Sequence, residues 1–316
     1  MEQFNTFLVL LDSNLSGSWW FPALLIGTGI FFTIYLGFPQ FKYFKSAFKI
    51  VSGKNNDESD GETTGFQALT TAMSGAVGTG NIGGVALAIW TGGPAAIFWM
   101  WITAIFGMTT KYVEVTLGHK YRTKLSDGSI SGGPMYYIEQ GLDFKWNGIK
   151  FPSKFVAILF AFFMMITAIG SGNMPQINNI ALVMNTEFSV PKLFTGLFLG
   201  VLLWIIIIGG IKRIASVTEK IVPFMAGIYV LACLYIIISN FTFIDDAFGL
   251  IFSEAFSPSA GVGGFIGVLI QGFRRGAFSN EAGSGAASIA HSAVITSYPA
   301  SEGLVALLEP FIDTVV

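Results

Sequence analysis

The chain has 316 residues, of which 53% are hydrophobic and only 11% are charged, and its formal net charge is -2. Soluble domains carry about 25% charged residues, so this composition predicts an all-α protein that crosses a membrane several times. The Lys and Arg residues form no patch with interleaved aromatic side chains, which excludes a nucleic-acid-binding surface. The single cysteine, Cys233, excludes an intramolecular disulfide.

A transmembrane helix needs about 20 mostly apolar residues, and the chain supplies a series of such runs that form a single transmembrane domain over residues 1–316. The first residues have neither a basic region nor a small-residue cleavage site, so we expect no signal peptide. We expect spans at about residues 19–38, 66–90, 94–118, 153–172, 193–211, 219–240 and 260–290, with the beginning of an eighth at about 303–316.

Three loops carry most of the basic residues, and basic loops face the cytoplasm. They follow the first, third and fifth expected spans, whereas the opposite loops hold Lys192 with the acidic Asp245, Asp246 and Glu254. We therefore expect a multi-pass protein of the plasma (inner) membrane, with its N-terminus outside and membrane lipid around its apolar faces. The basic residues of the three loops are Lys42, Lys45, Lys49, Lys54, Lys111, Lys120, Arg122, Lys124, Lys145, Lys150, Lys154, Lys212, Arg213 and Lys220.

Three connecting segments have recognisable patterns. Pro39 to Ser52 alternate basic with aromatic or aliphatic side chains, which suits a helix lying in the membrane interface, and a solvated linker fits the second half equally well. Residues 54–65 are polar and turn-rich, so we expect them to be disordered. A glycine pair leads into a short cytoplasmic helix that we expect from Pro134 to Gly141.

The second expected span is apolar enough for a bilayer but poor in helix-forming residues in its middle. Glycines lower helix stability, and small polar residues stand among them. In lipid every backbone N–H and C=O needs a partner, so a helix opens only where its freed groups line a protected cavity or bind a ligand. We expect a break near residues 75–84, which contain Gly75, Gly78, Thr79, Gly80, Asn81, Gly83 and Gly84.

The seventh expected span repeats this anomaly near residues 276–285. Gly272 and Gly276 precede Ala277 to Asn280, and Gly283 and Gly285 follow. The two broken spans are an odd number of spans apart, so they cross the membrane in opposite directions. Glycine-interrupted spans in matching places of two inverted halves are typical of the binding site of a secondary transporter.

The chemistry of a broken helix favours a ligand that carries both charges. The N–H end of one half suits a carboxylate, and the C=O end of the other suits a metal cation or an ammonium group. An amino acid matches such a site. The candidate substrate contacts in the first break are Gly78, Thr79, Gly80 and Asn81, and the candidate oxygen ligands for a cation are at Gly75, Ala76, Thr79 and Asn81.

Two runs carry a family resemblance. NIGGVALAIWTGGPAAIFWMW, from Asn81 to Trp101, and GAFSNEAGSGAASIAHSA, from Gly276 to Ala293, resemble the alanine or glycine:cation symporter family, also called sodium:alanine symporters. The segments GGPMYYIEQGL and YPASEGLVALLEPFID fit as well, so the resemblance covers essentially the whole chain. It implies a LeuT-like inverted-repeat bundle preceded by one extra N-terminal helix. It also implies import of small neutral amino acids with Na⁺, or with H⁺ in some members.

The resemblance also implies where the substrate lies. It places the substrate between the two broken helices, and it brings an amide from the segment GNMPQ against it, here Gln176 or Asn173. Buried amides need partners, although side chains of an outer loop wetted by water are the alternative. The family fold needs three further helices, so the resemblance implies a fragment truncated after the start of the eighth span, which we do not expect to transport by itself. The residues of the second break are Ala277, Phe278, Ser279 and Asn280.

Other charged residues have competing interpretations. Arg274 and Arg275 lie in an apolar span, where charge is often functional, so they are gating candidates, with extension toward the outer vestibule as the alternative. Glu281 is a candidate acceptor for backbone N–H groups at the second break. We expect Lys111 and Glu114 to be helix-end charges, and His119 and His291 to be interfacial residues rather than metal ligands.

The leading function is a secondary active transporter that moves alanine, glycine or a similar amino acid by alternating access. Na⁺ is the expected coupling ion, and a proton-coupled permease for another small amino acid is the alternative. A channel is a second class, but its filter is normally repeated by subunit symmetry. An intramembrane enzyme is not expected, because no GxSxG, HExxH or paired intramembrane Asp motif is present.

Overall fold

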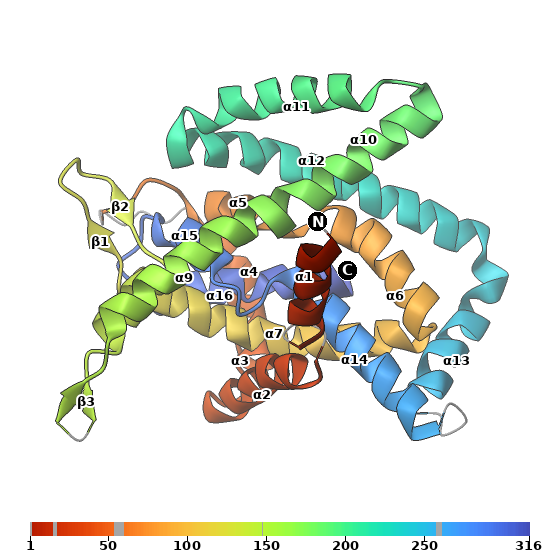
Figure 1. Cartoon of the computed structure of the whole chain (residues 1–316), viewed down its shortest axis with the longest axis horizontal. Coiled ribbons are helices and arrows are strands. Elements are labelled where there is room, and N and C mark those ends of the chain that lie inside the picture. Colours follow the sequence, from red (N-terminus) through yellow and green to blue (C-terminus); the bar gives the residue numbers. More distant parts are fainter. Residues whose placement is uncertain (1, 15–17, 54–59, 147, 257–260) are drawn as a thin grey trace.

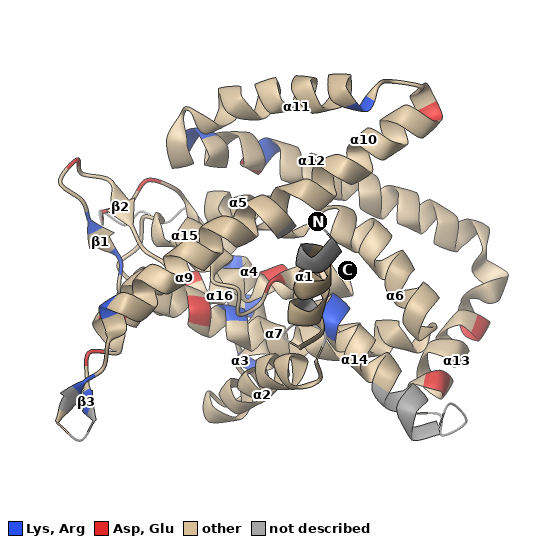
Figure 2. Ribbon diagram, viewed as in Figure 1, with Lys and Arg blue, Asp and Glu red and all other residues tan. Residues whose placement is uncertain are grey.

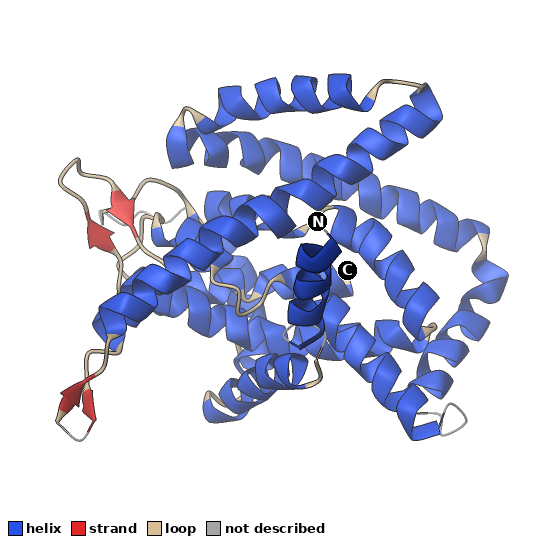
Figure 3. Ribbon diagram, in the orientation of Figure 1, coloured by secondary structure: helices blue, strands red, loops and turns tan. Residues whose placement is uncertain are grey.

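The computed structural model describes residues 2–14, 18–53, 60–146, 148–256 and 261–316. These residues are mostly helical, and the strands among them form two short hairpins (Figure 3). The N-terminal region contains α1 (Glu2–Asn14), α2 (Trp20–Tyr35), α3 (Pro39–Lys42) and α4 (Phe44–Ser52). The helices α3 and α4 occupy the amphipathic segment, and buried Ala47 of α4 packs against Leu307 and Leu308.

The glycine-rich second span is bent. Its first half is α5 (Gly65–Ala76), which begins with a capping box between Thr64 and Gln67. A π-helical turn, η1 (Gly80–Gly84), and α6 (Val85–Gly92) follow after a change of direction of 53°. Gly93 then turns the chain with a positive φ of 71° into α7 (Ala95–Lys120).

Two hairpins flank a short helix after α7. In the first hairpin, β1 (Thr123–Lys124) pairs antiparallel with β2 (Ile130–Ser131), with Thr123 opposite Ser131. In the second, β3 (Lys145–Trp146) pairs antiparallel with β4 (Ile149–Lys150). Between them lies α8 (Pro134–Gly141), over the residues where a short helix is predicted.

The middle of the chain forms long apolar helices. Ser153–Phe188 is continuously helical and contains a π-helical segment, and Gly210–Ser239 is a single helix; both are long and apolar enough to cross a membrane. Figure 2 shows charged residues near the ends of α9 to α12 and long uncharged stretches between them. These stretches expose large apolar side chains. The elements are α9 (Ser153–Thr167), η2 (Ala168–Asn173), α10 (Met174–Phe188), α11 (Lys192–Ile207) and α12 (Gly210–Ser239).

The C-terminal region packs around α7, which runs through the middle of the molecule (Figure 1). Close approach of α14 to α7 depends on small residues, because a Cβ on Gly272 would meet Trp99 at 2.5 Å and one on Gly276 would meet Thr103 at 2.9 Å. The elements of this region are η3 (Phe241–Phe243), α13 (Ile244–Ala255), α14 (Gly261–Asn280), α15 (Ala286–Ser292), α16 (Pro299–Ala306), α17 (Leu308–Pro310) and η5 (Phe311–Val315).

Arg122, just after α7, joins the segment before α5 to the segment after α15. Its guanidinium donates to the carbonyl oxygens of Asp60 at 2.8 Å, Val294 at 2.5 Å and Thr296 at 3.0 Å. Thr63 and Val294 also form a parallel β-bridge. The prediction of a disordered segment over 54–65 is therefore wrong for its second part, because backbone pairing and Arg122 hold it, while residues 54–59 lie outside the described residues.

Candidate functional site

The first break is stabilised by a local turn. α5 ends at Ala76, and the N–H of Gly78 donates to Oδ1 of Asn81 at 2.8 Å. The N–H of Asn81 donates in turn to the carbonyl oxygen of Gly78 at 3.1 Å. The Asn81 side chain thus partners a backbone N–H that the interrupted helix leaves free.

The amide of Gln176 reaches the same break from α10. Its Oε1 accepts from the N–H of Thr79 at 3.0 Å and from Oγ1 of Thr79 at 2.8 Å. A Cβ on Gly78 would lie 2.9 Å from Oε1 and Nε2 of Gln176, so only glycine leaves room for this approach. Asn173, the other amide considered from the sequence, is exposed in η2.

The second break lies between α14 and α15. α14 ends at Asn280, and three residues of positive φ follow: Glu281 at 51°, Gly283 at 90° and Gly285 at 93°. Oδ1 of Asn280 accepts from the N–H of Ala282 at 3.0 Å, and Oε2 of Glu114 on α7 accepts from the N–H of Gly283 at 2.9 Å. Glu114, rather than Glu281, is therefore the carboxylate that partners a freed N–H at this break.

Asp313 of η5 joins the first break to the last turn of α14, just before the second break. Nδ2 of Asn81 donates to Oδ1 and to the carbonyl oxygen of Asp313, both at 2.8 Å, and Oγ of Ser279 donates to its Oδ2 at 2.7 Å. Nδ2 of Asn81 also lies 3.4 Å from Oγ of Ser279. Segments far apart in the sequence thus meet at one carboxylate.

The surroundings of Asp313 suit a cation. Its side chain is 8% exposed, and among the described residues no Lys, Arg or His nitrogen lies within the 4.0 Å of an ion pair with it. A buried carboxylate needs compensation, and here only neutral donors supply it. Backbone and side-chain oxygens at broken helices are the ligands that transporters present to Na⁺. The sequence prediction missed Asp313, although a carboxylate in an apolar run was a signal for it.

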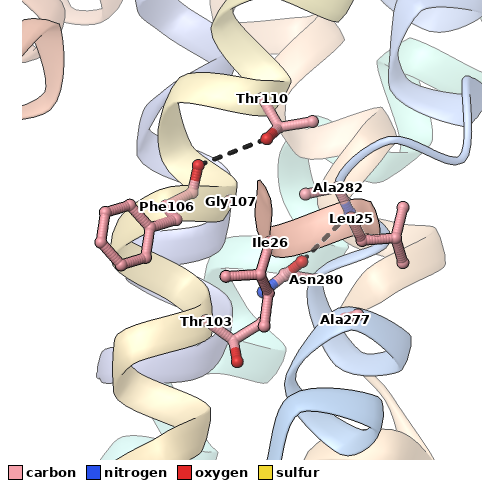
Figure 4. Close-up of a pocket in the computed structure, with 9 residues that line it drawn as sticks. All are labelled: Leu25, Ile26, Thr103, Phe106, Gly107, Thr110, Ala277, Asn280 and Ala282. Atoms are coloured by element: carbon pink, nitrogen blue, oxygen red, sulfur yellow. Dashed lines mark hydrogen bonds between the residues drawn. The ribbon is translucent and has the colours of Figure 1, made fainter. Parts of the chain in front are cut away.

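A small cavity lies behind the second break, between α2, α7 and α14 (Figure 4). It has a volume of about 10 Å³, which is roughly that of one water molecule. Leu25 and Ile26 of α2 line it together with Asn280 and Ala282 (Figure 4). Tight packing explains its size, since a Cβ on Gly107 would meet Ala282 at 3.2 Å. The second break is therefore closely packed on the side that faces α2 and α7.

Comparison with known proteins adds to this geometry. The sequence matches the sodium:alanine symporter family over residues 1–316. The chain belongs to the sodium:alanine symporter family. Its members are transporters and not enzymes, and the apolar helices identify an integral membrane protein of mostly helical structure.

Curated relatives of this family include transporters of several organisms. The chain is 47% identical to the sodium/alanine symporter AgcS of Methanococcus maripaludis, over 98% of the chain and 68% of AgcS. It is 41% identical to the amino-acid carrier protein AlsT of Bacillus subtilis, over 100% of the chain and 65% of AlsT. It is 38% identical to the probable sodium/glutamine symporter GlnT of Bacillus subtilis, over 100% of the chain and 64% of GlnT. The chain thus spans about two thirds of the length of these symporters.

The remaining candidate residues of this family member are arranged unevenly around the breaks. Ser279 and Asn280 are buried at the second break and Ala76 is buried at the first, whereas Phe278 is 53% exposed and Gly75 is exposed. Ala277 lines the small cavity. Thr79 and Gly80 are half-buried in the first break.

The two arginines considered for gating, Arg274 and Arg275, are half-buried in α14. Among the residues that the structure describes, no carboxylate lies within the 4.0 Å of an ion pair with either of them.

Four charged or titratable residues are more buried than the sequence analysis suggests. Lys111 and Glu114 are not helix-end charges at a surface, because their side chains are 2% and 6% exposed within the bundle. His119 and His291, expected as interfacial residues, are 3% and 0% exposed. The hydropathy of the surrounding sequence did not indicate this burial, since the partners of each residue are distant in the sequence. Among the described residues, no group of three or more His, Cys, Asp or Glu side chains is arranged to hold a metal ion.

Proposed function

We propose that this chain forms the major part of a secondary transporter that couples import of alanine, glycine or a similar small neutral amino acid to Na⁺. One observation carries the proposal: the first break and the last turn of α14, just before the second break, meet at the buried carboxylate of Asp313, through Asn81 and Ser279. The name of AgcS supports alanine and Na⁺, and the name of AlsT supports an amino-acid cargo without specifying which one.

The proposed site binds the two charges of an amino acid in different places. The N–H end of η1 and α6 faces the first break and suits the substrate carboxylate. The carbonyl end of α5 and the oxygens of Asn81, Ser279 and Asp313 suit Na⁺ or the substrate ammonium group. Gln176 fixes the backbone at Thr79, so it sets the shape of the pocket beside these groups.

We further propose that the two broken spans belong to inverted repeats of a LeuT-like bundle with one extra N-terminal helix. In this arrangement the repeats rock around the paired breaks and expose the site to either side in turn. The N-terminus lies outside, and the first broken span enters the membrane from the cytoplasm. The basic loops support this orientation.

The test is uptake of radiolabelled alanine and glycine by the full-length protein in proteoliposomes, with Na⁺ and pH gradients imposed separately. We expect saturable, uphill uptake driven by an inward Na⁺ gradient at equal pH. Uptake that follows the pH gradient alone would replace Na⁺ by H⁺, and uptake that neither saturates nor runs uphill would contradict a carrier.

The matched variants are Asp313→Asn and Asp127→Asn. The first removes the charge between the breaks and should raise the Na⁺ concentration for half-maximal uptake about tenfold, since one hydrogen-bonded charge is worth about 1.5–3 kcal/mol. Asp127 lies in an exposed turn, where its carboxylate accepts from Ser129, and its variant should behave as the wild type. Equal Na⁺ dependence of the two variants would remove Asp313 from the site.

A further inference from the structure

Four buried charged or titratable side chains form a network beside the proposed site. Nζ of Lys111 lies 3.0 Å from Oε2 of Glu309, Nε2 of His291 lies 2.7 Å from Oε1 of Glu309, and Nδ1 of His291 contacts Oε1 of Glu302. Their side chains are 0–2% exposed. We refer to Lys111, His291, Glu302 and Glu309 as the buried ionic network.

The network contains no residue of either break, yet it is expensive to bury. Removing charged groups from water costs free energy that pairing only partly returns. Apolar side chains of similar volume would fill the same space without that cost. Its presence therefore calls for a role that depends on fixed geometry, such as setting the position of a neighbouring group.

The neighbouring group is Asp313, which lies four residues after Glu309 on the continuous helical segment of α17 and η5. Residues four apart lie on the same face of a helix, so the anchored position of Glu309 sets the direction in which Asp313 projects. Pro310 lies between them and has no N–H, and the π-helical η5 begins at the next residue. Backbone hydrogen bonds hold this junction weakly, so side-chain anchors determine its register.

The helix α7 that holds Glu309 also holds the second break. Lys111 lies on α7, one turn before Glu114, whose carboxylate accepts from the N–H of Gly283. One rigid helix therefore holds both the segment that carries Asp313 and the loop that follows Asn280. Ser279, which donates to Asp313, immediately precedes Asn280.

We propose that Glu309 is a positioning residue for the cation site: clamped between Lys111 and His291, it holds Asp313 at the correct place between Asn81 and Ser279 without touching the cation. This inference rests on the proposed function for its transport readout. Glu302 shares His291 with Glu309 but lies on α16, outside the segment that carries Asp313.

The test compares Glu309→Asp with Glu302→Asp in the full-length protein. Both substitutions keep the charge and shorten a buried side chain by one methylene, so both preserve the pairing that folding requires. We expect Glu309→Asp to raise the Na⁺ concentration for half-maximal alanine uptake about tenfold, equivalent to about 1.4 kcal/mol, with little change in maximal rate. Glu302→Asp should remain within about twofold of the wild type.

Equal shifts in the two variants, or a loss of maximal rate without a shift in Na⁺ dependence, would overturn the positioning role and leave a structural one. A wild-type protein that ignores Na⁺ would instead contradict the proposed function. A structure of the Glu309→Asp protein decides the inference in that case and also if uptake is too weak to measure. Asp313 displaced from Asn81 and Ser279 supports the inference, and Asp313 unmoved overturns it.

Discussion

At the scale of single residues, the first break depends on side chains that replace helical hydrogen bonds. Gln176 accepts two hydrogen bonds from Thr79, and Asn81 accepts one from the N–H of Gly78. Each of these bonds satisfies a part-buried donor that the interrupted helix leaves without an intrahelical partner. The break is therefore a specified structure and not a flexible point in a helix.

The clearest prediction at this scale concerns Gly78→Ala. The new Cβ would lie 2.9 Å from the Gln176 amide, so Gln176 must move away from Thr79. Two hydrogen bonds of about 1 kcal/mol each are then lost, which corresponds to a roughly 30-fold fall in alanine affinity. Gly84→Ala is the control, because nothing lies within 4 Å of its Cβ position. Equilibrium binding of labelled alanine to the purified full-length protein measures both, and equal affinities would contradict the assignment.

The sequence indicated only those parts of the candidate site that depend on local composition. The glycines of both breaks mark where regular helix is disfavoured, and this information is contained in neighbouring residues. The partners of Asn81 cannot be inferred from neighbouring residues, since Asp313 lies 232 positions away and Ser279 lies 198 positions away. The burial of Lys111 could not be predicted either. A charged residue in an apolar run has the same local sequence whether its partner is water or Glu309.

At the scale of elements, Arg122 connects the entrance of the first broken segment to the exit of the second. It donates to carbonyl oxygens on both segments, and backbone pairing adds to the link, with the N–H of Ile295 donating to Thr63 at 2.9 Å. A planar guanidinium with five donors is suited to gather several carbonyl groups. If α5 moves relative to α15, these hydrogen bonds must therefore break, or the two segments must move together with Arg122.

We predict that Arg122→Gln loosens the junction. Hydrogen bonds from a charged donor are worth about 1.5–3 kcal/mol, so amide hydrogen exchange at Thr63 and Ile295 should accelerate by about 10- to 100-fold. Lys124→Gln removes a neighbouring positive charge whose partner, Asp60, is exposed, and exposed pairs contribute only about 0–1 kcal/mol. Exchange that is equally fast in both variants would show that Arg122 does not hold the junction.

Polar side chains do not by themselves end a helix in this chain. The segment from Ala168 to Asn185 contains several amides, and the sequence left a wet outer loop open as an alternative, yet it is helical through η2 and α10. Intrahelical hydrogen bonds satisfy the backbone there regardless of side-chain polarity. The glycines of η1 indicated an interruption of the helix there, whereas the π-helical turn η5 had no such signal in the sequence.

At the scale of the whole molecule, charge placement predicts orientation. The exposed Lys124 lies in a basic loop and the exposed Lys192 in an opposite one. In a full-length protein without other cysteines, including Cys233→Ser, we expect Lys192→Cys to react with an impermeant maleimide in intact cells. Lys124→Cys should react only after permeabilisation. Labelling in the reverse order would invert the orientation and with it the direction of the first broken segment.

The bend at Gly78 depends on groups that the ribosome adds much later. Gln176 follows Thr79 by 97 positions, and Asp313 follows Asn81 by 232. At a synthesis rate of about 5–20 residues per second, Asn81 waits roughly 10–50 seconds for its carboxylate. Unpartnered backbone groups in hydrocarbon cost several kcal/mol each, so we expect the nascent segment to stay more regularly helical until these partners are made. We then expect the bend to become fixed only after Gln176 and Asp313 have been synthesised.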